Sequence, residues 1–200
     1  MRKAFLLILC LTVLSCKSDK IDSKTESKNR IGIKKFEIAN GKIKDSIVEY
    51  LEINGKEYAN QIWLTDYNDQ YIGGNYFEAF IKDTTKLGEV TRLRFWLEPT
   101  ISYESEMYVL LPIDDDKLEN DFSNLFELKL DTFPSLKNDG IPHPELTDLN
   151  LHLNYITEFG LEYEESGKKR VRGVIIERGK LNEKGYERRL FFDKTFYIVE

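Results

Sequence analysis

The chain has 200 residues, with 29 Lys and Arg against 35 Asp and Glu, and therefore a formal net charge of −6. This length is typical of one domain, and such a chain buries about 70% of its unfolded surface without needing a metal or a disulfide. Hydrophobic residues at 41% and aromatic residues at 12% exclude a wholly disordered chain. The acidic balance argues against non-specific nucleic-acid binding, and no apolar run reaches the roughly 20 residues of a membrane-spanning helix.

The first sixteen residues have the pattern of an export signal. Arg2 and Lys3 precede an apolar run at positions 4–14, which is too short to span a bilayer and has the length of a signal-peptide core. The run ends in the sequence VLSC at positions 13–16, and polar residues follow at once. This ending resembles the lipobox of bacterial lipoproteins, which has a branched residue three positions before the cysteine and a small residue directly before it. The alternative is an ordinary secretory signal in which Cys16 merely lies near the cleavage site.

The lipoprotein resemblance implies removal of residues 1–15 and acylation of Cys16, with palmitate among the attached chains. Each buried methylene contributes about 0.8 kcal/mol, so several acyl chains anchor a protein stably. Cleavage removes Cys10, and the remaining cysteine is acylated, which excludes a disulfide, thiol catalysis and a cysteine zinc site. In Gram-negative lipoproteins an Asp after the cysteine is associated with inner-membrane retention, and Lys17 stands there instead. The resemblance therefore implies an anchor in the outer membrane, with the domain facing either the periplasm or the surface.

Residues 17–35 are mostly Lys, Ser, Asp, Glu and Asn, with too few apolar side chains to pack. We predict a flexible tether here, which by random-coil scaling holds the rest of the chain roughly 25 Å from the lipid surface. No internal repeat or linker-like segment divides the sequence beyond it. The predicted organisation is therefore a signal peptide over 1–15, a lipidated cysteine and tether over 16–35, and a single β-rich domain over 36–200.

The first predicted hairpin turns at Asn54-Gly55, a dipeptide that favours type I′ turns because both central residues need positive φ. A two-residue loop at this point places Leu51 opposite Tyr58 and Ile47 opposite Ile62. Both pairs are apolar, which supports this register.

A second hairpin is predicted over residues 89–112, where apolar and polar residues alternate on both sides of a proline. With a three-residue loop in the middle, Leu93 faces Met107 and Arg94 faces Glu106. Core residues then meet core residues and a base meets an acid, as stable cross-strand pairing requires.

One short helix is predicted over residues 114–125, because three aspartates at its start offer an N-cap and Leu118, Phe122 and Leu125 recur at helical spacing. A long proline-rich loop follows at 131–148, and it is the longest segment without a hydrophobic period. Loops of this length inside a compact domain are commonly mobile or functional.

A third hairpin is predicted around Gly167, with Glu164 opposite Arg170 and Glu162 opposite Arg172. Two further short strands complete the chain, which brings the sum to about ten strands. Their apolar face must be covered. The predicted fold class is therefore mainly β, an antiparallel sheet that forms a barrel, half-barrel or sandwich.

The common catalytic motifs are missing from the sequence: it has no GxSxG, HExxH, GxxxxGK[ST] or GxGxxG. No cofactor is predicted, and the sequence favours a non-enzymatic protein. A motif-free enzyme would centre on His143 in the proline-rich loop, where Asp139 and Glu145 would complete an acid–base or metal site. A loop histidine between two prolines is more often a surface residue, so these three are weak candidates.

The strongest candidate site is a cluster of aromatic residues between positions 63 and 80. Strand alternation directs Phe77 inward and Tyr76 and Phe80 outward, beside charged neighbours, and Trp96 falls on a polar face next to Arg94. Outward aromatic side chains among charges are typical of surfaces that recognise proteins or sugars. The alternative is that another layer covers this face and makes these residues part of the core. The predicted ligand-binding residues are Trp63, Tyr76, Phe80, Arg94 and Trp96.

These features predict a lipid-anchored, non-enzymatic binding or interaction module of the cell envelope, with the membrane as one partner and a protein or a glycan as the other. Three alternatives stay open. The first is an immunity or inhibitor lipoprotein that neutralises a toxic protein, since an acidic face steers basic partners. The second is a carrier whose barrel encloses an apolar ligand, and the third is the motif-free enzyme.

Overall fold

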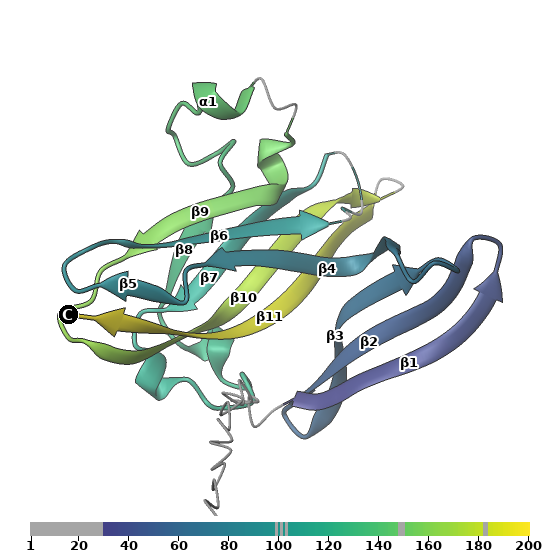
Figure 1. Cartoon of the computed structure of the whole chain (residues 1–200), viewed down its shortest axis with the longest axis horizontal. Helices are drawn as coiled ribbons and strands as arrows, with labels where there is room; N and C mark the ends of the chain where they lie inside the picture. The colour runs from purple at the N-terminus through teal and green to yellow at the C-terminus, as the bar shows by residue number, and fades with distance from the viewer. Residues whose placement is uncertain (1–29, 99, 101, 103, 148–150, 182–183) are drawn as a thin grey trace, which may run out of the picture.

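The computed structural model describes residues 30–98, 100, 102, 104–147, 151–181 and 184–200, so the predicted signal peptide, Cys16 and most of the tether lie outside the described residues (Figure 1). The described chain forms a six-stranded sheet of order β1-β2-β3-β4-β6-β9 and a five-stranded sheet of order β5-β11-β10-β7-β8. Neighbouring strands are antiparallel, except that β5 runs parallel to β11. This architecture confirms the prediction of a mainly β fold, and the two sheets form an open sandwich.

The six-stranded sheet contains β1 (Arg30–Asn40), β2 (Ile43–Ile53), β3 (Lys56–Thr65), β4 (Tyr71–Ile81), β6 (Thr91–Glu98) and β9 (Ile156–Leu161). The five-stranded sheet contains β5 (Thr84–Lys86), β11 (Lys184–Val199), β10 (Gly167–Leu181), β7 (Glu106–Pro112) and β8 (Leu130–Pro134). The loops hold four short helical turns, η1 (Asp115–Lys117), η2 (Leu125–Glu127), α1 (Pro144–Thr147) and η3 (Leu153–Tyr155). Figure 1 shows β4, β6 and β9 lying over the second sheet, while β1 and β2 stand to one side.

The turn between β2 and β3 forms as predicted. Asn54 and Gly55 have φ of 57° and 70°, the two positive values that a type I′ turn needs, and Leu51 pairs with Tyr58. The predicted tether, in contrast, extends too far, because β1 already begins at Arg30 and pairs along β2. Residues 33–40 of this edge strand are exposed. Because neither face of the strand is buried, apolar and polar residues do not alternate there, and the sequence does not indicate a strand. Residues 30–35 therefore belong to the domain.

A β-bulge at Asn60 corrects the rest of the predicted register. Asn60 is the extra residue on β3, so Ile47 pairs with Trp63 and not with Ile62. The Asn60 side chain is buried and bridges the two sheets: its amide nitrogen donates to the Phe191 carbonyl at 2.9 Å, and its oxygen accepts the Phe191 N–H at 2.7 Å. The Asn60 side chain thus makes the two hydrogen bonds that a backbone partner of Phe191 would make in a β-ladder, where β3 approaches the edge of β11.

The predicted hairpin of β6 with β7 is wrong, because the two strands lie in opposite sheets. Arg94 in β6 lies between Phe80 of β4 and Glu158 of β9, and Glu106 in β7 pairs with Arg178 of β10. The predicted inward faces are nevertheless confirmed, since their apolar side chains are buried and face one another across the sandwich. These side chains are Leu93, Phe95 and Leu97 on β6 and Met107, Val109 and Leu111 on β7.

The predicted hairpin around Gly167 is wrong for the same reason. Strand β9 ends at Leu161 in the first sheet, and β10 pairs with β11 and β7 in the second. The predicted pairs of Glu164 with Arg170 and Glu162 with Arg172 therefore do not form. Arg170 instead holds Asp193 of β11 at 2.5 Å, and β11 is a single strand over the span predicted as two.

The segment predicted as a helix forms two short 3-10 turns, η1 and η2. Phe122 between them has φ of 58°, a left-handed conformation that ends any continuous helix. The aspartate at the predicted N-cap, Asp114, makes no side-chain cap hydrogen bond. The three apolar residues chosen by spacing, Leu118, Phe122 and Leu125, are still buried, because they form one hydrophobic cluster with Leu51 of β2, Val174 and Ile176 of β10 and Phe191 of β11.

The space between the sheets is filled by side chains. Aromatic rings form much of this core, with Phe133 and Phe159 stacked at 3.9 Å between centroids and Phe95 and Phe192 at 4.6 Å. None of the helices in the described part of the chain has both the length and the apolar character to cross a membrane.

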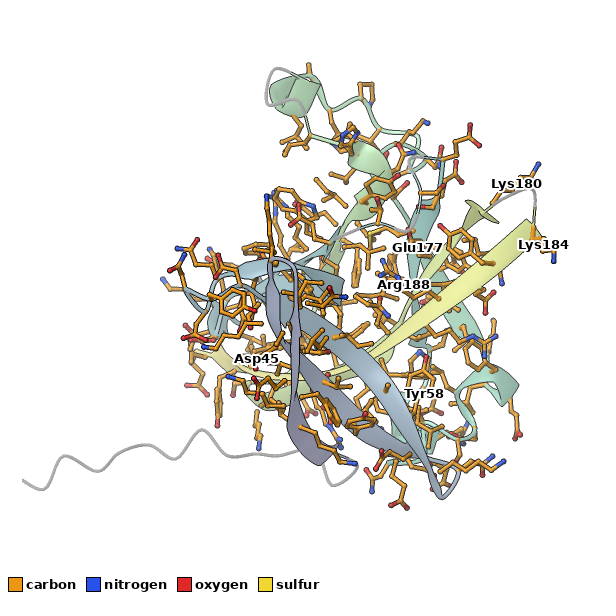
Figure 2. All side chains as sticks on the ribbon, turned by 90° about the vertical axis from the view of Figure 1, so that its right-hand side faces the viewer. Asp45, Tyr58, Glu177, Lys180, Lys184 and Arg188 are labelled. Carbon is orange, nitrogen blue, oxygen red and sulfur yellow. The ribbon has the colours of Figure 1, made fainter. Side chains whose placement is uncertain are left out.

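An ion pair also lies in this interior. Glu177 on β10 and Arg188 on β11 are cross-strand partners, 2.6 Å apart, and their side chains are 0% and 6% exposed (Figure 2). The Ser105 hydroxyl donates to the other Glu177 carboxylate oxygen, and Arg188 also donates to the Asn75 side chain. The pair thus ties the β10–β11 ladder to β4 and to the segment that leads into β7.

Candidate functional site

The outer face of the first sheet carries the five predicted ligand-binding residues, four of them on β4 and β6. The β4–β6 register places Tyr76 opposite Glu98, Trp96 opposite Glu78, and Phe80 opposite Arg94. Strand alternation sends these side chains away from the core, while Phe77 between them is only 7% exposed. Phe80 is 50% exposed, and Tyr76 and Trp96 are half-buried.

Trp63, the fifth predicted residue, joins the same face from β3. Its ring stacks on Tyr76 with 6.0 Å between centroids, and the Tyr71 ring also contacts Tyr76, at 6.4 Å. Gly74 lets β3 and β4 approach each other closely because it has no side chain; a Cβ at that position would lie 2.0 Å from the Ile62 carbonyl oxygen. The result is a continuous row of three rings across β3 and β4.

A groove of about 590 Å³ runs along this row. Its floor is formed by Tyr71 and Tyr76 of β4 and by Trp96 and Glu98 of β6, and its far wall by the segment 151–155. A smaller hollow of about 100 Å³ adjoins it, and Trp96 and Leu151 line both spaces. Such a volume is within the range of pockets that bind small organic ligands.

The wall of the groove is held in place by hydrogen bonds to the connection between β6 and β7 and to the segment after β8. The Tyr155 hydroxyl donates to the Ser102 carbonyl at 2.6 Å, and the backbone N–H of Ser105 donates to the same oxygen at 3.2 Å. The Leu136 N–H donates to the Ile156 carbonyl at 2.8 Å, which joins the end of β8 to the start of β9. These hydrogen bonds connect the wall to residues on both sides of it in the fold.

The charges around the groove are not balanced. Arg94 is held by Glu158 at 2.5 Å, and Arg92 lies 3.6 Å from the same carboxylate. In the described part of the chain, Glu78 and Glu98 form no ion pair. Burial, followed by the negative charges of Glu98 and Glu78, raises the pKa of Tyr76 above its ordinary value. The groove is therefore an acidic environment with aromatic walls.

The weak catalytic candidates lie in the proline-rich loop, outside the groove lining. His143 Nε2 is 2.8 Å from Asp139 Oδ2, and both side chains are 14% exposed. Asp139 also accepts the N–H of Ile141 at 2.8 Å; although burial opposes its charge, this N–H and His143 lower its pKa. All of these contacts are between residues of the proline-rich loop. The Glu145 side chain lies outside the described residues, and the described residues contain no group of three metal-ligating side chains.

Sequence reasoning did not select several residues of the groove. Glu98 and His152 are not among the predicted site residues; both line the groove because β6 pairs with β4 and because the segment 151–155 folds beside them. Tyr71 belongs to the predicted aromatic cluster, but it lies two residues before the glycine pair Gly73-Gly74, where no alternation indicates its place on a strand. Comparisons of this chain with protein-family models, with curated proteins and with solved structures find no match.

Proposed function

We propose that this chain is a non-enzymatic binding module of the cell envelope, anchored in the outer membrane through lipid on Cys16, and that it binds its ligand in the aromatic groove of the first sheet. The observation that carries the proposal is the row of partly exposed rings beside a groove of about 590 Å³. Aromatic side chains supply large contact areas with little loss of side-chain entropy, and proteins concentrate them at recognition sites.

The packing of the interior supports a site on the surface. A carrier of apolar ligands needs space inside its barrel, whereas here the rings of Phe95, Phe133, Phe159 and Phe192 contact one another between the sheets. The groove, in contrast, combines open volume with half-buried Tyr76 and Trp96. We therefore place the ligand on the outer face of the first sheet.

A pull-down with residues 20–200 as bait tests the proposal, using envelope and secreted fractions and extracts of small molecules, read by mass spectrometry. The groove variants are Trp96→Leu and Phe80→Ala. Tyr197→Ala is the matched control, because Tyr197 is 49% exposed, close to the 50% of Phe80, and lies on β11 in the other sheet.

The proposal expects a ligand or partner that wild type and Tyr197→Ala retain and that Trp96→Leu loses. Retention by both groove variants, with their folding verified by circular dichroism, would show that binding occurs elsewhere. A captured toxic protein would identify the module as an immunity protein.

A further inference from the structure

We infer that the groove binds a small organic cation, an ammonium group that carries an apolar body, with the charge held between Trp96, Tyr76 and Glu98. This inference rests on the proposed function and names the chemical class of its ligand. Three properties of the groove carry it: its uncompensated negative charge, its ring faces and its volume.

In the described part of the chain, neither Glu98 nor Glu78 forms an ion pair. Glu98 lines the groove opposite Tyr76, and Glu78 is the cross-strand partner of Trp96. The two arginines on the same outer face both lie beside Glu158, so this face carries Arg92 and Arg94 against three carboxylates, Glu78, Glu98 and Glu158. Within the described residues, therefore, two carboxylates remain beside the rings for an external positive charge, and placing a cation there offsets their mutual repulsion.

The ring faces are also open to a cation. Elsewhere the protein places its own bases over aromatic rings, as with Lys34 over Tyr50 at 4.3 Å and Arg189 over Phe126 at 4.4 Å. In the described part of the chain no lysine or arginine covers Tyr76 or Trp96. A ring face attracts a cation through its quadrupole, most strongly for tryptophan, and aromatic cages use this attraction to hold ammonium ions.

The size and lining of the groove indicate more than a bare ammonium ion. A volume of about 590 Å³ accommodates a ligand with a carbon skeleton. Ile72 and Leu151 supply apolar surface next to the charged end, and the adjoining hollow continues past Trp96 to Phe80 and Leu146. Neutral sugars also stack on aromatic rings and donate hydrogen bonds to carboxylates, but only a cation also offsets the negative charge of Glu98 and Glu78.

The test compares two probes of nearly equal shape, choline and its uncharged carbon analogue 3,3-dimethyl-1-butanol, together with methyl glucoside. Binding to the full chain is followed by ligand-observed NMR in a polyoxyethylene detergent, which contributes neither charge nor sugar. The variants are Glu98→Gln and Trp96→Leu. Glu164→Gln is the matched control, since Glu164 is an exposed carboxylate between β9 and β10.

We expect choline to bind about tenfold more tightly than its neutral analogue. Glu98→Gln should weaken choline binding about three- to fivefold without changing the analogue, Trp96→Leu should weaken both, and Glu164→Gln should weaken neither. Raising the salt concentration should weaken choline alone, because the carboxylates are exposed.

Equal affinity for choline and its neutral analogue would overturn the inference and leave an apolar groove, so the proposed binding function would stand. Binding of methyl glucoside but not of choline would also overturn the inference. The ligand would then be a glycan, and the proposed binding function would stand. If no probe binds and Trp96→Leu keeps its pull-down partner, both the inference and the proposed function fail.

Discussion

Replacing Arg188 by methionine should destabilise the domain strongly, because the change removes the guanidinium beside a buried carboxylate. The Glu177 side chain is fully buried, with Arg188 at 2.6 Å and the Ser105 hydroxyl on its other oxygen. Removing one partner of a buried ion pair costs about 3–5 kcal/mol, since the remaining charge cannot return to water. Domains are commonly stable by about 5–15 kcal/mol, so the variant should still fold but lose much of its margin.

The next rung of the same ladder supplies the control. Arg178 and Glu187 are also cross-strand partners on β10 and β11, 2.7 Å apart, but the Arg178 side chain is 62% exposed. Arg178→Met should therefore cost less than about 1 kcal/mol. Urea unfolding of residues 20–200, monitored by tryptophan fluorescence, gives both free energies of unfolding.

A double variant tests the cause of the loss. Glu177→Leu combined with Arg188→Met removes both charges, and a buried ion pair replaced by apolar residues is often neutral or stabilising. We therefore expect the double variant to be more stable than Arg188→Met alone. Equal losses for Arg188→Met and Arg178→Met would refute the reasoning, because the cost would then not depend on burial.

Three further predictions concern the strand contact, the loop and the anchor. Gly74→Ala should lose about 2–4 kcal/mol of unfolding free energy in urea, because its φ is 137° and a Cβ would strike the neighbouring strand; Gly185→Ala, with open space around it, should change little. The lowered pKa of Asp139 means that its stabilisation is present above the ordinary value of 3.8 and is lost as the pH falls through the folded value. Asp139→Asn should thus flatten the acid side of the stability–pH curve, and an unchanged slope would contradict this. Cys16→Ser should abolish incorporation of labelled palmitate and release the chain from membranes, whereas continued labelling would place the lipid elsewhere.

Local sequence patterns predict the faces of the strands but not their partners. Alternation correctly identified the buried sides of β6 and β7. The pairing partner of β6 was wrong because a base at Arg94 is satisfied equally well by Glu106, as predicted, or by Glu158, as observed. Nearness in sequence favoured the first, whereas the fold places β6 and β7 on opposite sides of one core, where Leu93 and Met107 meet through their side chains.

The Asn60 bulge shows a second limit of sequence reasoning. An asparagine inside an apolar strand reads as a solvent-facing residue, yet here its amide completes the hydrogen bonds of Phe191, far along the chain. No residue near Asn60 in the sequence indicates that its partner is Phe191. The single extra residue then shifts Ile47 from Ile62 to Trp63, and with it moves the tryptophan on the outer face relative to β2.

The groove depends on the pairing of β6, and this explains why only part of it could be predicted. Tyr76, Phe80 and Trp96 were found because each stands on the polar side of an alternating strand. Their assembly into one surface needs the β4–β6 pairing, which the predicted β6–β7 hairpin excluded. Glu98 becomes a groove residue only through that pairing, since it then lies opposite Tyr76. The chemistry of the site, rings beside uncompensated carboxylates, is therefore a property of the strand order and not of any motif in the chain.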